Sequence, residues 1–320
     1  MIRLFFAILM ILACVGTLAA EDYPKRPVKI VLPFAAAGGT DTVARILAQE
    51  LGSQMGQSVI VENRGGANGN IGAEVVAAAE PDGYTVLYNT SFIVTNPWLY
   101  KSLSYDTAKD FEPVMLSAQV PLVLLVNNSV PAKTIEEFIA YTKVRPGELS
   151  YASSGIGGST HLANLLFLQA AGLEAMHVPY RGGGPALNDL LAGAVQFYMD
   201  TANTALPHIK AGTLRALAVT SKERLATLPD VPTIAETLKQ PDFEVVSWHG
   251  VMVPAKTPAE IITRLQKEFA TALNKPAIKE KLAAQAAEPI ASSTEEYKAF
   301  LVKESELWGR TIKSANVTLE

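Results

Sequence analysis

The chain has 320 residues, one cysteine and a formal net charge of −4 at neutral pH. A chain of this length buries about three quarters of its unfolded surface and usually forms more than one domain. The mild acidity argues against nucleic acid as a partner, because binding to the phosphate backbone needs clustered positive charge.

The first 20 residues have the features of a secretory signal peptide. Arg3 precedes an uninterrupted apolar run, residues 4–15, and the small Ala19 and Ala20 precede the charged Glu21. A membrane anchor needs roughly 20 apolar residues, so this run is too short for one. We expect residues 1–20 to be removed and the mature protein to be exported.

Cys14 lies in the same segment. It leaves a lipoprotein anchor as the second interpretation, but Leu12 is an indifferent residue for that lipidation motif. Cleavage removes the only cysteine of the chain, which excludes disulfides, zinc–thiolate sites and cysteine nucleophiles. No later apolar stretch is long enough to span a bilayer.

Strands and helices alternate through the mature chain. Short apolar runs indicate strands, and apolar residues three and four apart indicate helices. In chain order we expect strand 28–32, helix 40–51, strand 58–61, helix 71–79 and strand 84–88, then strand 149–152, a helix through 162–168, strand 175–179, helix 186–192 and strand 195–199. This alternation predicts βαβ units with parallel sheets, and its two copies predict two similar α/β lobes.

Two further apolar segments, 121–126 and 248–254, are expected to cross between the lobes. The segments 258–273, 277–284 and 294–314 are expected to form helices that pack on the first lobe. These expectations assign residues 21–120 plus 250–320 to lobe 1 and residues 121–249 to lobe 2.

Each lobe carries a glycine-rich turn between a strand and a helix. In lobe 1 the turn is Gly38-Gly39 followed by Thr40-Asp41, and in lobe 2 it is the segment 153–161. Unpaired N–H groups at the positive end of a helix dipole favour anions, and such sheets bind ligands at the carboxyl ends of their strands. The two turns predict two lobes that close on one anionic solute. The alternative is that these residues only form a tight turn and cap the helix, without binding a ligand.

Single residues of these turns carry more specific expectations. A Cβ at Gly39 or Gly158 is expected to exclude the ligand or to disturb a conformation that only glycine holds cheaply. Asp41 is expected to cap its helix and fix the loop. Asp200, at the end of a strand, is expected to face the ligand and accept a hydrogen bond from a hydroxyl or ammonium group.

The second turn also has the residue types of a hydrolase, with Ser154 or Ser159 near His161. No G-x-S-x-G elbow is present, and His161 falls just inside the helix, where it is expected to line the cleft or cap the loop. Neither turn has dinucleotide or P-loop spacing, and the histidines lack acidic partners at metal spacing. We therefore expect no catalytic residue, no metal and no cofactor.

Three arginines and three aromatic residues lie beside the loops or at strand ends: Arg45, Arg64, Arg181, Trp248, Tyr180 and Tyr198. Each arginine either reaches a ligand carboxylate as a fork or forms an ion pair within its lobe. The aromatic residues either wall the pocket or belong to the core.

With these residues in view, the chain resembles the solute receptors of tripartite tricarboxylate transporters, the Bordetella-uptake-gene (Bug) family. The resemblance covers the whole mature chain and rests on the order of many short motifs. These are Pro33-Phe34 with Gly38-Gly39-Thr40-Asp41 and Ala44-Arg45, Val61-Glu62-Asn63-Arg64 with Gly69-Asn70-Ile71-Gly72, Pro81-Asp82-Gly83-Tyr84, Asn96-Pro97, Tyr105-Asp106 with Asp110-Phe111-Glu112-Pro113-Val114, Pro179-Tyr180-Arg181-Gly182, and Leu228-Pro229-Asp230-Val231-Pro232-Thr233.

The resemblance implies a two-lobed periplasmic-binding-protein fold of the Venus-flytrap kind (type II), with a βαβ sheet in each lobe. Family members hold a ligand carboxylate largely through backbone amides and ordered waters. The positions carried over from the family, together with the flanking residues above, give the expected ligand contacts: Phe34, Ala37, Gly38, Gly39, Thr40, Asp41, Ser91, Thr95, Ser153, Ser154, Gly155, Gly157, Gly158, Ser159, His161, Tyr180, Arg181, Asp200 and Trp248.

The sequence departs from the family pattern in the first loop. Similar chains often have proline and a further glycine in place of Ala36 and Ala37, and glycine in place of Asn89. The first loop is therefore expected to be less open, and the identity of the ligand does not carry over.

The leading interpretation is a monomeric periplasmic receptor without catalytic activity. It captures a small organic acid between its lobes and delivers it to the membrane subunits of a tripartite tricarboxylate transporter. The enzyme alternative is a secreted serine hydrolase that uses Ser154 or Ser159 with His161. A third possibility is a sensory protein that presents the solute to a membrane receptor.

Overall fold

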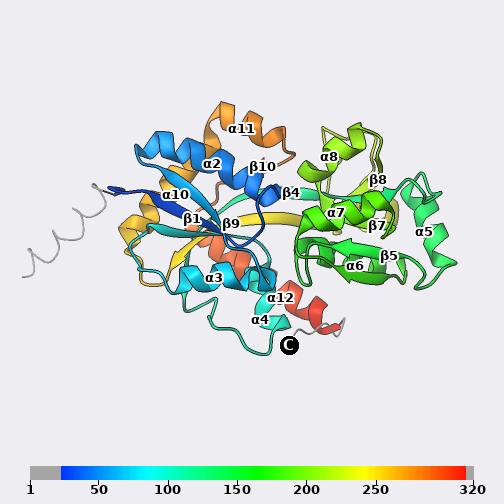
Figure 1. Ribbon diagram of the computed structural model, residues 1–320, viewed down its shortest axis with the longest axis horizontal. Coiled ribbons are helices and arrows are strands. Elements are labelled where there is room, and N and C mark those ends of the chain that lie inside the picture. The colour runs from blue at the N-terminus through cyan, green and yellow to red at the C-terminus, as the bar shows by residue number, and fades with distance from the viewer. Residues whose placement is uncertain (1–22, 315–320) are drawn as a thin grey trace, which may run out of the picture.

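The computed structural model describes residues 23–314. The expected signal peptide, its cleavage site and Cys14 lie outside the described residues. The described chain forms two groups of helices and strands, joined by the long strands β4 (Phe111–Asn127) and β9 (Val246–Pro254), as Figure 1 shows. No helix among the described residues is long and apolar enough to cross a membrane.

Ten strands of the described chain form one sheet. On one side of β4 and β9 lie three parallel strands, in the spatial order β2 (Val59–Asn63), β1 (Val28–Leu32) and β3 (Thr85–Asn89). On the other side lie three more parallel strands, β7 (Phe197–Thr201), β5 (Ser150–Ser153) and β6 (Met176–Pro179). The part that contains β1 is called the first lobe below, and the part that contains β5 the second lobe.

Strand β4 belongs to both lobes because it changes partners along its length. Its residues from Phe111 to Pro121 pair with β9, and those from Leu122 onward pair with β7 and with β8 (Leu214–Val219). In the first lobe the short β10 (Glu288–Pro289) also pairs with β4. Every β4 residue from Leu122 to Val126 is fully buried, as expected for an apolar strand that is covered on both faces.

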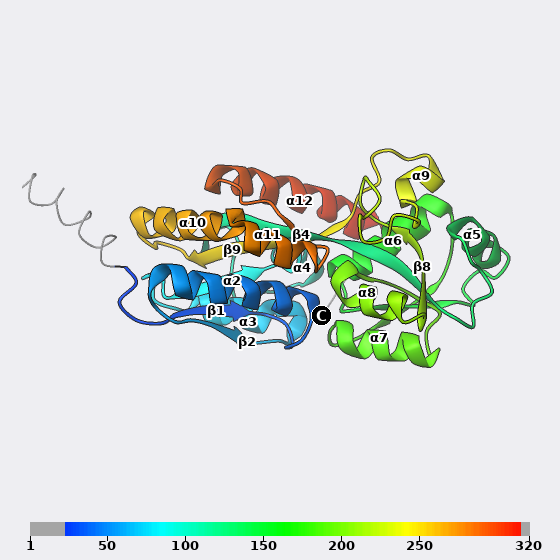
Figure 2. The ribbon, with the colours of Figure 1, turned by 90° about the horizontal axis from the view of Figure 1, so that it is seen from above.

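Helices cover both faces of the sheet. Those of the first lobe are α2 (Gly39–Met55), η1 (Ala67–Gly69), α3 (Asn70–Ala77), α4 (Phe92–Leu99), α10 (Ala259–Asn274), α11 (Pro276–Ala283) and α12 (Thr294–Ser314). Those of the second lobe are α5 (Ile135–Lys143), α6 (Ser159–Ala171), α7 (Gly183–Ala192), α8 (Ala202–Lys210) and α9 (Ile234–Leu238). Figure 2 shows α10, α11 and α12 on the first lobe, as the sequence predicts.

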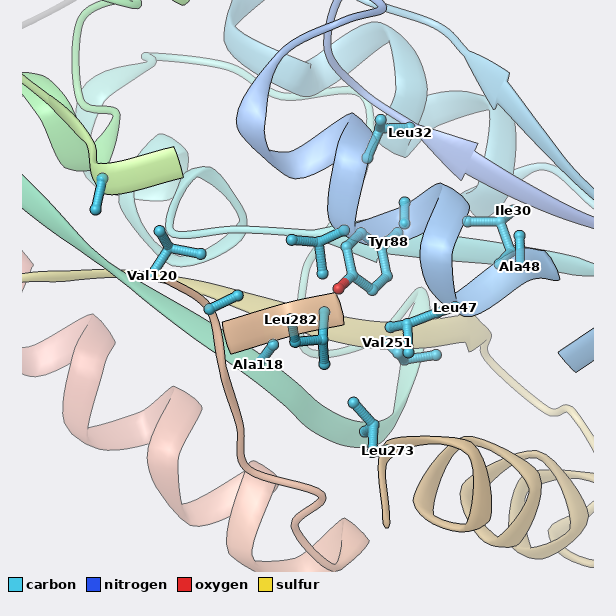
Figure 3. Close-up of a cluster of buried hydrophobic side chains, with 14 of the residues drawn as sticks. Ile30, Leu32, Leu47, Ala48, Tyr88, Ala118, Val120, Val251, Leu273 and Leu282 are labelled. Atoms are coloured by element: carbon cyan, nitrogen blue, oxygen red, sulfur yellow. The ribbon is translucent and has the colours of Figure 1, made fainter. Parts of the chain in front are cut away.

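Alternate residues of β1 supply two separate cores, because successive side chains of a strand point to opposite faces. Ile30 and Leu32 pack with Leu47 of α2 in the cluster that Figure 3 shows, where α11 also contributes Leu282. Val31 packs in the other cluster, with residues of α3, α4 and α12. The glycine turn that follows β1 is therefore anchored by a buried strand. The turn that follows β5 is anchored in the same way, because all four residues of β5 are buried.

Strand 28–32 and helix 294–314 are confirmed to the residue, and most other expected elements are displaced by a few residues. The expected strand 121–126 is only the second part of β4, which begins at Phe111. Helices η1, α4, α5, α8 and α9 and strands β8 and β10 were not expected. Two of these helices contain proline, Pro97 in α4 and Pro207 in α8. Helix α4 is also apolar on nearly every side, so it shows no helical periodicity to detect.

Candidate functional site

Three helices begin at glycine residues and direct their first turns into one chamber between the lobes. The N-cap residues are Gly38 for α2, Gly158 for α6 and Gly182 for α7. Figures 1 and 2 both show the start of α2 facing α7 and α8 across the junction. None of the three helices has a side-chain cap, so their first N–H groups remain available to a ligand.

The chamber has a volume of about 290 Å³, which is small beside sites for drug-sized ligands. Its walls come from both lobes: Phe34, Ala35, Ala36, Ala37, Gly38, Gly39, Thr40, Asp41, Asn68, Thr90 and Phe92 from the first, Ser154, Gly158, Ser159, Gly182, Gly183, Gly184, Pro185, Leu187, Tyr198, Asp200, Thr201 and Thr204 from the second, and Ser247 from β9. No lysine, arginine or histidine of the described chain lines it.

An outer chamber of about 790 Å³ adjoins the first and shares Phe34, Ala35, Asn68, Ser154 and Gly182 with it. Arg181 and Tyr180 line this outer chamber. A larger groove of about 970 Å³ lies between α4, residues 100–113 and α12. That groove is built by the first lobe alone and receives none of the three helix N-termini, so we place the site in the smaller chamber.

Asp41 fixes the first loop from inside. Its carboxylate accepts hydrogen bonds from the Ala37 N–H (3.0 Å), Arg45 Nε (2.9 Å) and Asn63 Nδ2 (2.9 Å). Burial alone would raise the pKa of Asp41, but hydrogen bonds from Arg45, Asn63 and Ala37 together lower it. Asp41 therefore stays ionised and fixes the turn ahead of α2, although the α2 N-cap residue itself has no side-chain cap.

Ala37 occupies the left-handed region of backbone space, with φ of 63°. This is the position where similar chains often have glycine, and the hydrogen bond to Asp41 holds it there. An L-residue in this conformation costs roughly 1–2 kcal/mol. Alanine in place of the family's usual glycine at position 37 is therefore tolerated, but its backbone is strained.

The glycines of the two loops have different requirements. Gly39 is needed for close approach, because a Cβ there would lie 2.6 Å from Asn203 Oδ1 and 2.9 Å from Thr201 Oγ1 of the other lobe. The expectation for the backbone of Gly158 is wrong: its φ of −74° and ψ of 163° are open to any residue. Gly157 holds the special position instead, with φ of 79° and Leu99 where its Cβ would be.

His161 supports the second loop from behind. Its Nδ1 accepts the Gly157 N–H at 3.0 Å, and its ring stacks on His177 with 4.1 Å between centroids. Burial, and secondly His177, lower the pKa of His161 to about 3. The ring is neutral at physiological pH and caps the loop, the second of its two expected roles.

No hydrogen bond among the described residues joins His161 to either serine of the hydrolase alternative. The Ser154 Oγ lies 2.9 Å from Thr160 Oγ1 instead. Ser153 Oγ contacts His177 Nε2 at 2.6 Å, but both groups lie behind the chamber wall. The geometry does not support a nucleophile with its base.

Asp200 lines the chamber from the end of β7 and is only 3% exposed. Its Oδ1 accepts the N–H of Thr201 at 2.8 Å, and its Oδ2 has no hydrogen-bond partner among the described residues. Burial raises the pKa of Asp200 to about 6, and the nearby donor groups, among them the Thr201 N–H, only partly offset this rise. At neutral pH it is mostly an ionised acceptor.

The structure sorts the expected contact residues into three groups. Ten line the inner chamber: Phe34, Ala37, Gly38, Gly39, Thr40, Asp41, Ser154, Gly158, Ser159 and Asp200. Gly155, Tyr180 and Arg181 line the outer chamber. Neither chamber is lined by the remaining six, Ser91, Thr95, Ser153, Gly157, His161 and Trp248.

Two of these six residues, Thr95 and Trp248, make contacts elsewhere. Thr95 Oγ1 donates to the Gly157 carbonyl at 3.1 Å and so joins the lobes. Trp248 packs against Tyr297 and Phe300 and donates its indole N–H to Glu304 at 2.8 Å. It therefore belongs to the core and does not wall the pocket.

Two of the three arginines beside the loops form ion pairs within the first lobe, Arg45 with Asp41 and Arg64 with Glu62.

Sequence reasoning missed the third helix terminus, Gly182 to Pro185, and the residues Asn68, Thr201 and Thr204. The run Arg181-Gly182-Gly183-Gly184-Pro185 opens a helix after a strand, as the other two loops do. That shared pattern was a sufficient signal for the third loop. Thr201 and Thr204 gave no comparable signal, because α8 was not expected.

A family model described as the tripartite tricarboxylate transporter family receptor matches residues 43–317. The chain belongs to this family. Protein BugT of Bordetella pertussis is 36% identical over 325 residues, a match that spans 100% of this chain and 99% of BugT. Family members are receptors for solutes, so this protein is a solute receptor of a transport system and not an enzyme.

Solved structures agree with this membership. Rpa4515 of R. palustris, solved with adipate, has a TM-score of 0.89 and 38% identity, covering 93% of this chain and 99% of that one. MatC (Rpa3494) from Rhodopseudomonas palustris, solved with bound malate, has a TM-score of 0.83 and 32% identity, covering 91% of this chain and 100% of that one. The two-lobed α/β architecture of this receptor is therefore that of its solved relatives.

Proposed function

We propose that this receptor binds a small carboxylate in the inner chamber. The observation that carries the proposal is the convergence of three uncapped helix N-termini on a chamber that no described cation lines. Backbone N–H groups already oriented at helix ends stabilise an anion without a basic side chain. The related receptors solved with adipate and malate hold ligands of this chemical class.

The ligand contacts in this proposal are the residues that line the two chambers. The lobes, residues 21–120 plus 250–320 and residues 121–249, close on the carboxylate by bending near Pro121, where β4 changes partners, and near Ser247 to Gly250 of β9. Two connecting strands permit such a hinge motion with few new contacts. The closed receptor works as an exported, periplasmic monomer that passes its solute to the membrane subunits of the transporter.

Isothermal titration of the purified protein with pairs of similar shape and different charge tests the proposal. Succinate and adipate should bind, and the corresponding neutral diamides should bind at least tenfold more weakly, because the helix termini attract the charge. Small-angle scattering should show a smaller radius of gyration at saturation. Equal binding of acid and diamide would refute the anion site, and native mass spectrometry of the fresh protein would identify a co-purifying ligand.

A further inference from the structure

The chamber contains two buried polar groups that the protein itself leaves unused. The Asp200 Oδ2 and the Tyr198 hydroxyl are both buried, and neither has a hydrogen-bond partner among the described residues. Both side chains line the inner chamber. A buried polar group without a partner costs about 1–3 kcal/mol, so a pair of them in a binding site indicates that a ligand supplies the partner.

The two groups lie together beneath one helix terminus. A Cβ built on Gly183, the first residue of α7, would lie 3.5 Å from the Tyr198 hydroxyl and 3.9 Å from Asp200 Oδ1. The N–H of Thr201 already occupies Oδ1, at 2.8 Å. The Tyr198 hydroxyl and the Asp200 carboxyl group therefore lie next to the α7 N-terminus, where the proposed function places a carboxylate.

The chemistry of the pair selects its partner. Burial, and secondly the charge of Asp200, raise the pKa of Tyr198 well above its usual value, so its hydroxyl keeps its proton. Tyr198 thus offers a donor and ionised Asp200 offers an acceptor. Among the described residues that line this chamber, the other titratable group is Asp41 of α2, which is held ionised by its own partners.

Three kinds of ligand group can be compared at this position. A second carboxylate has no proton to give Asp200 and is repelled by its charge. An ammonium group only donates, and the positive ends of three helix dipoles disfavour it. A hydroxyl group accepts from Tyr198 and donates to Asp200, and it adds no charge.

We propose that Tyr198 and Asp200 form a hydroxyl subsite, so that the solute is a hydroxycarboxylate. The inference rests on the proposed function, because the helix termini must hold the carboxylate for its hydroxyl to reach this pair. Family membership leaves the point open, since adipate has no hydroxyl group and malate has one.

The test is isothermal titration with acids that differ by one hydroxyl group: lactate against propionate, malate against succinate, and 2-hydroxyglutarate against glutarate. In at least one pair the hydroxy acid should bind tenfold or more tightly, because a site built around a hydroxyl rejects the analogue that lacks it. Tyr198→Phe and Asp200→Asn should each reduce this ratio at least fivefold while the deoxy acid still binds. Tyr141→Phe on α5 and Asp242→Asn on an exposed loop are the matched controls and should leave the ratio unchanged.

The outcomes separate the two proposals. Equal affinities within all three pairs, with no effect of either variant, would refute the hydroxyl subsite while leaving the carboxylate site intact. Tighter binding of aspartate than of malate would also refute it, in favour of an ammonium subsite. If no acid of either kind binds, the proposed function and this inference are both wrong. Should Asp200→Asn fail to fold, the wild-type ratio and Tyr198→Phe decide.

Discussion

Gly39→Ala should weaken ligand binding without weakening the fold. The added Cβ would lie 2.6 Å from Asn203 Oδ1 and 2.9 Å from Thr201 Oγ1, both of the second lobe, whereas 3.4 Å is ordinary contact. Either the lobes separate locally by most of an ångström, or the Asn203 side chain turns away. Alanine is also the better helix former, so the first lobe itself loses nothing.

The expected loss of binding free energy follows from the hydrogen bond and the rotamer that Asn203 loses when its side chain moves. Its Oδ1 accepts the Thr204 N–H at 3.1 Å, and losing that bond costs about 1 kcal/mol. An off-rotamer side chain in a buried position adds about 1 kcal/mol. The closed, liganded state should therefore be destabilised by about 2 kcal/mol, or roughly thirtyfold in Kd.

The assay is titration calorimetry with the tightest-binding acid, alongside the melting temperature of the unliganded protein. Gly52→Ala is the matched control, because Gly52 lies on the same helix and its Cβ would make ordinary contact, 3.4 Å from the Gln57 carbonyl. Gly39→Ala should raise Kd while Gly52→Ala does not. Wild-type affinity in Gly39→Ala, with the same closure in small-angle scattering, would refute the reasoning that the lobes meet at Gly39.

Four further outcomes are expected. Burial raises the pKa of Asp200 to about 6 from 3.8, so the folded state binds more protons than the unfolded state between these values and stability falls as pH rises through them. Asp200→Asn should therefore be more stable at pH 7 by about 2–3 kcal/mol, with the gain vanishing near pH 4 in urea unfolding. Ala37→Gly should raise the unfolding free energy by about 1 kcal/mol by relieving the left-handed strain, and an unchanged melting temperature would show that no strain exists there. Asp41→Ala should lower the unfolding free energy by about 2 kcal/mol, since the Ala37 N–H and the Asn63 amide lose their acceptor. Denaturant titration measures this loss. Arg181→Ala, in the outer chamber, should change Kd less than Gly39→Ala, and abolished binding in that variant would indicate a guanidinium clamp in place of the helix termini.

The sequence by itself determined the family, the alternation of strands and helices, and two of the three glycine loops that line the chamber. Those features are local: apolar runs and glycine turns act within a few residues, so their signal lies in the sequence order. The expectation that Asp41 fixes its loop was also of this local kind, because the carboxylate reaches Ala37 only four residues away.

Tertiary structure decided which residues share the chamber. Trp248 and Tyr198 both lie on strands, yet only Tyr198 faces the chamber, because Trp248 packs beneath α12 instead. Gly39 is required by residues of the other lobe more than 160 positions away, and no local pattern contains that contact. The unused groups of Tyr198 and Asp200 became visible only when every neighbouring donor and acceptor was in place, since whether a polar group has a partner depends on the whole packed interior.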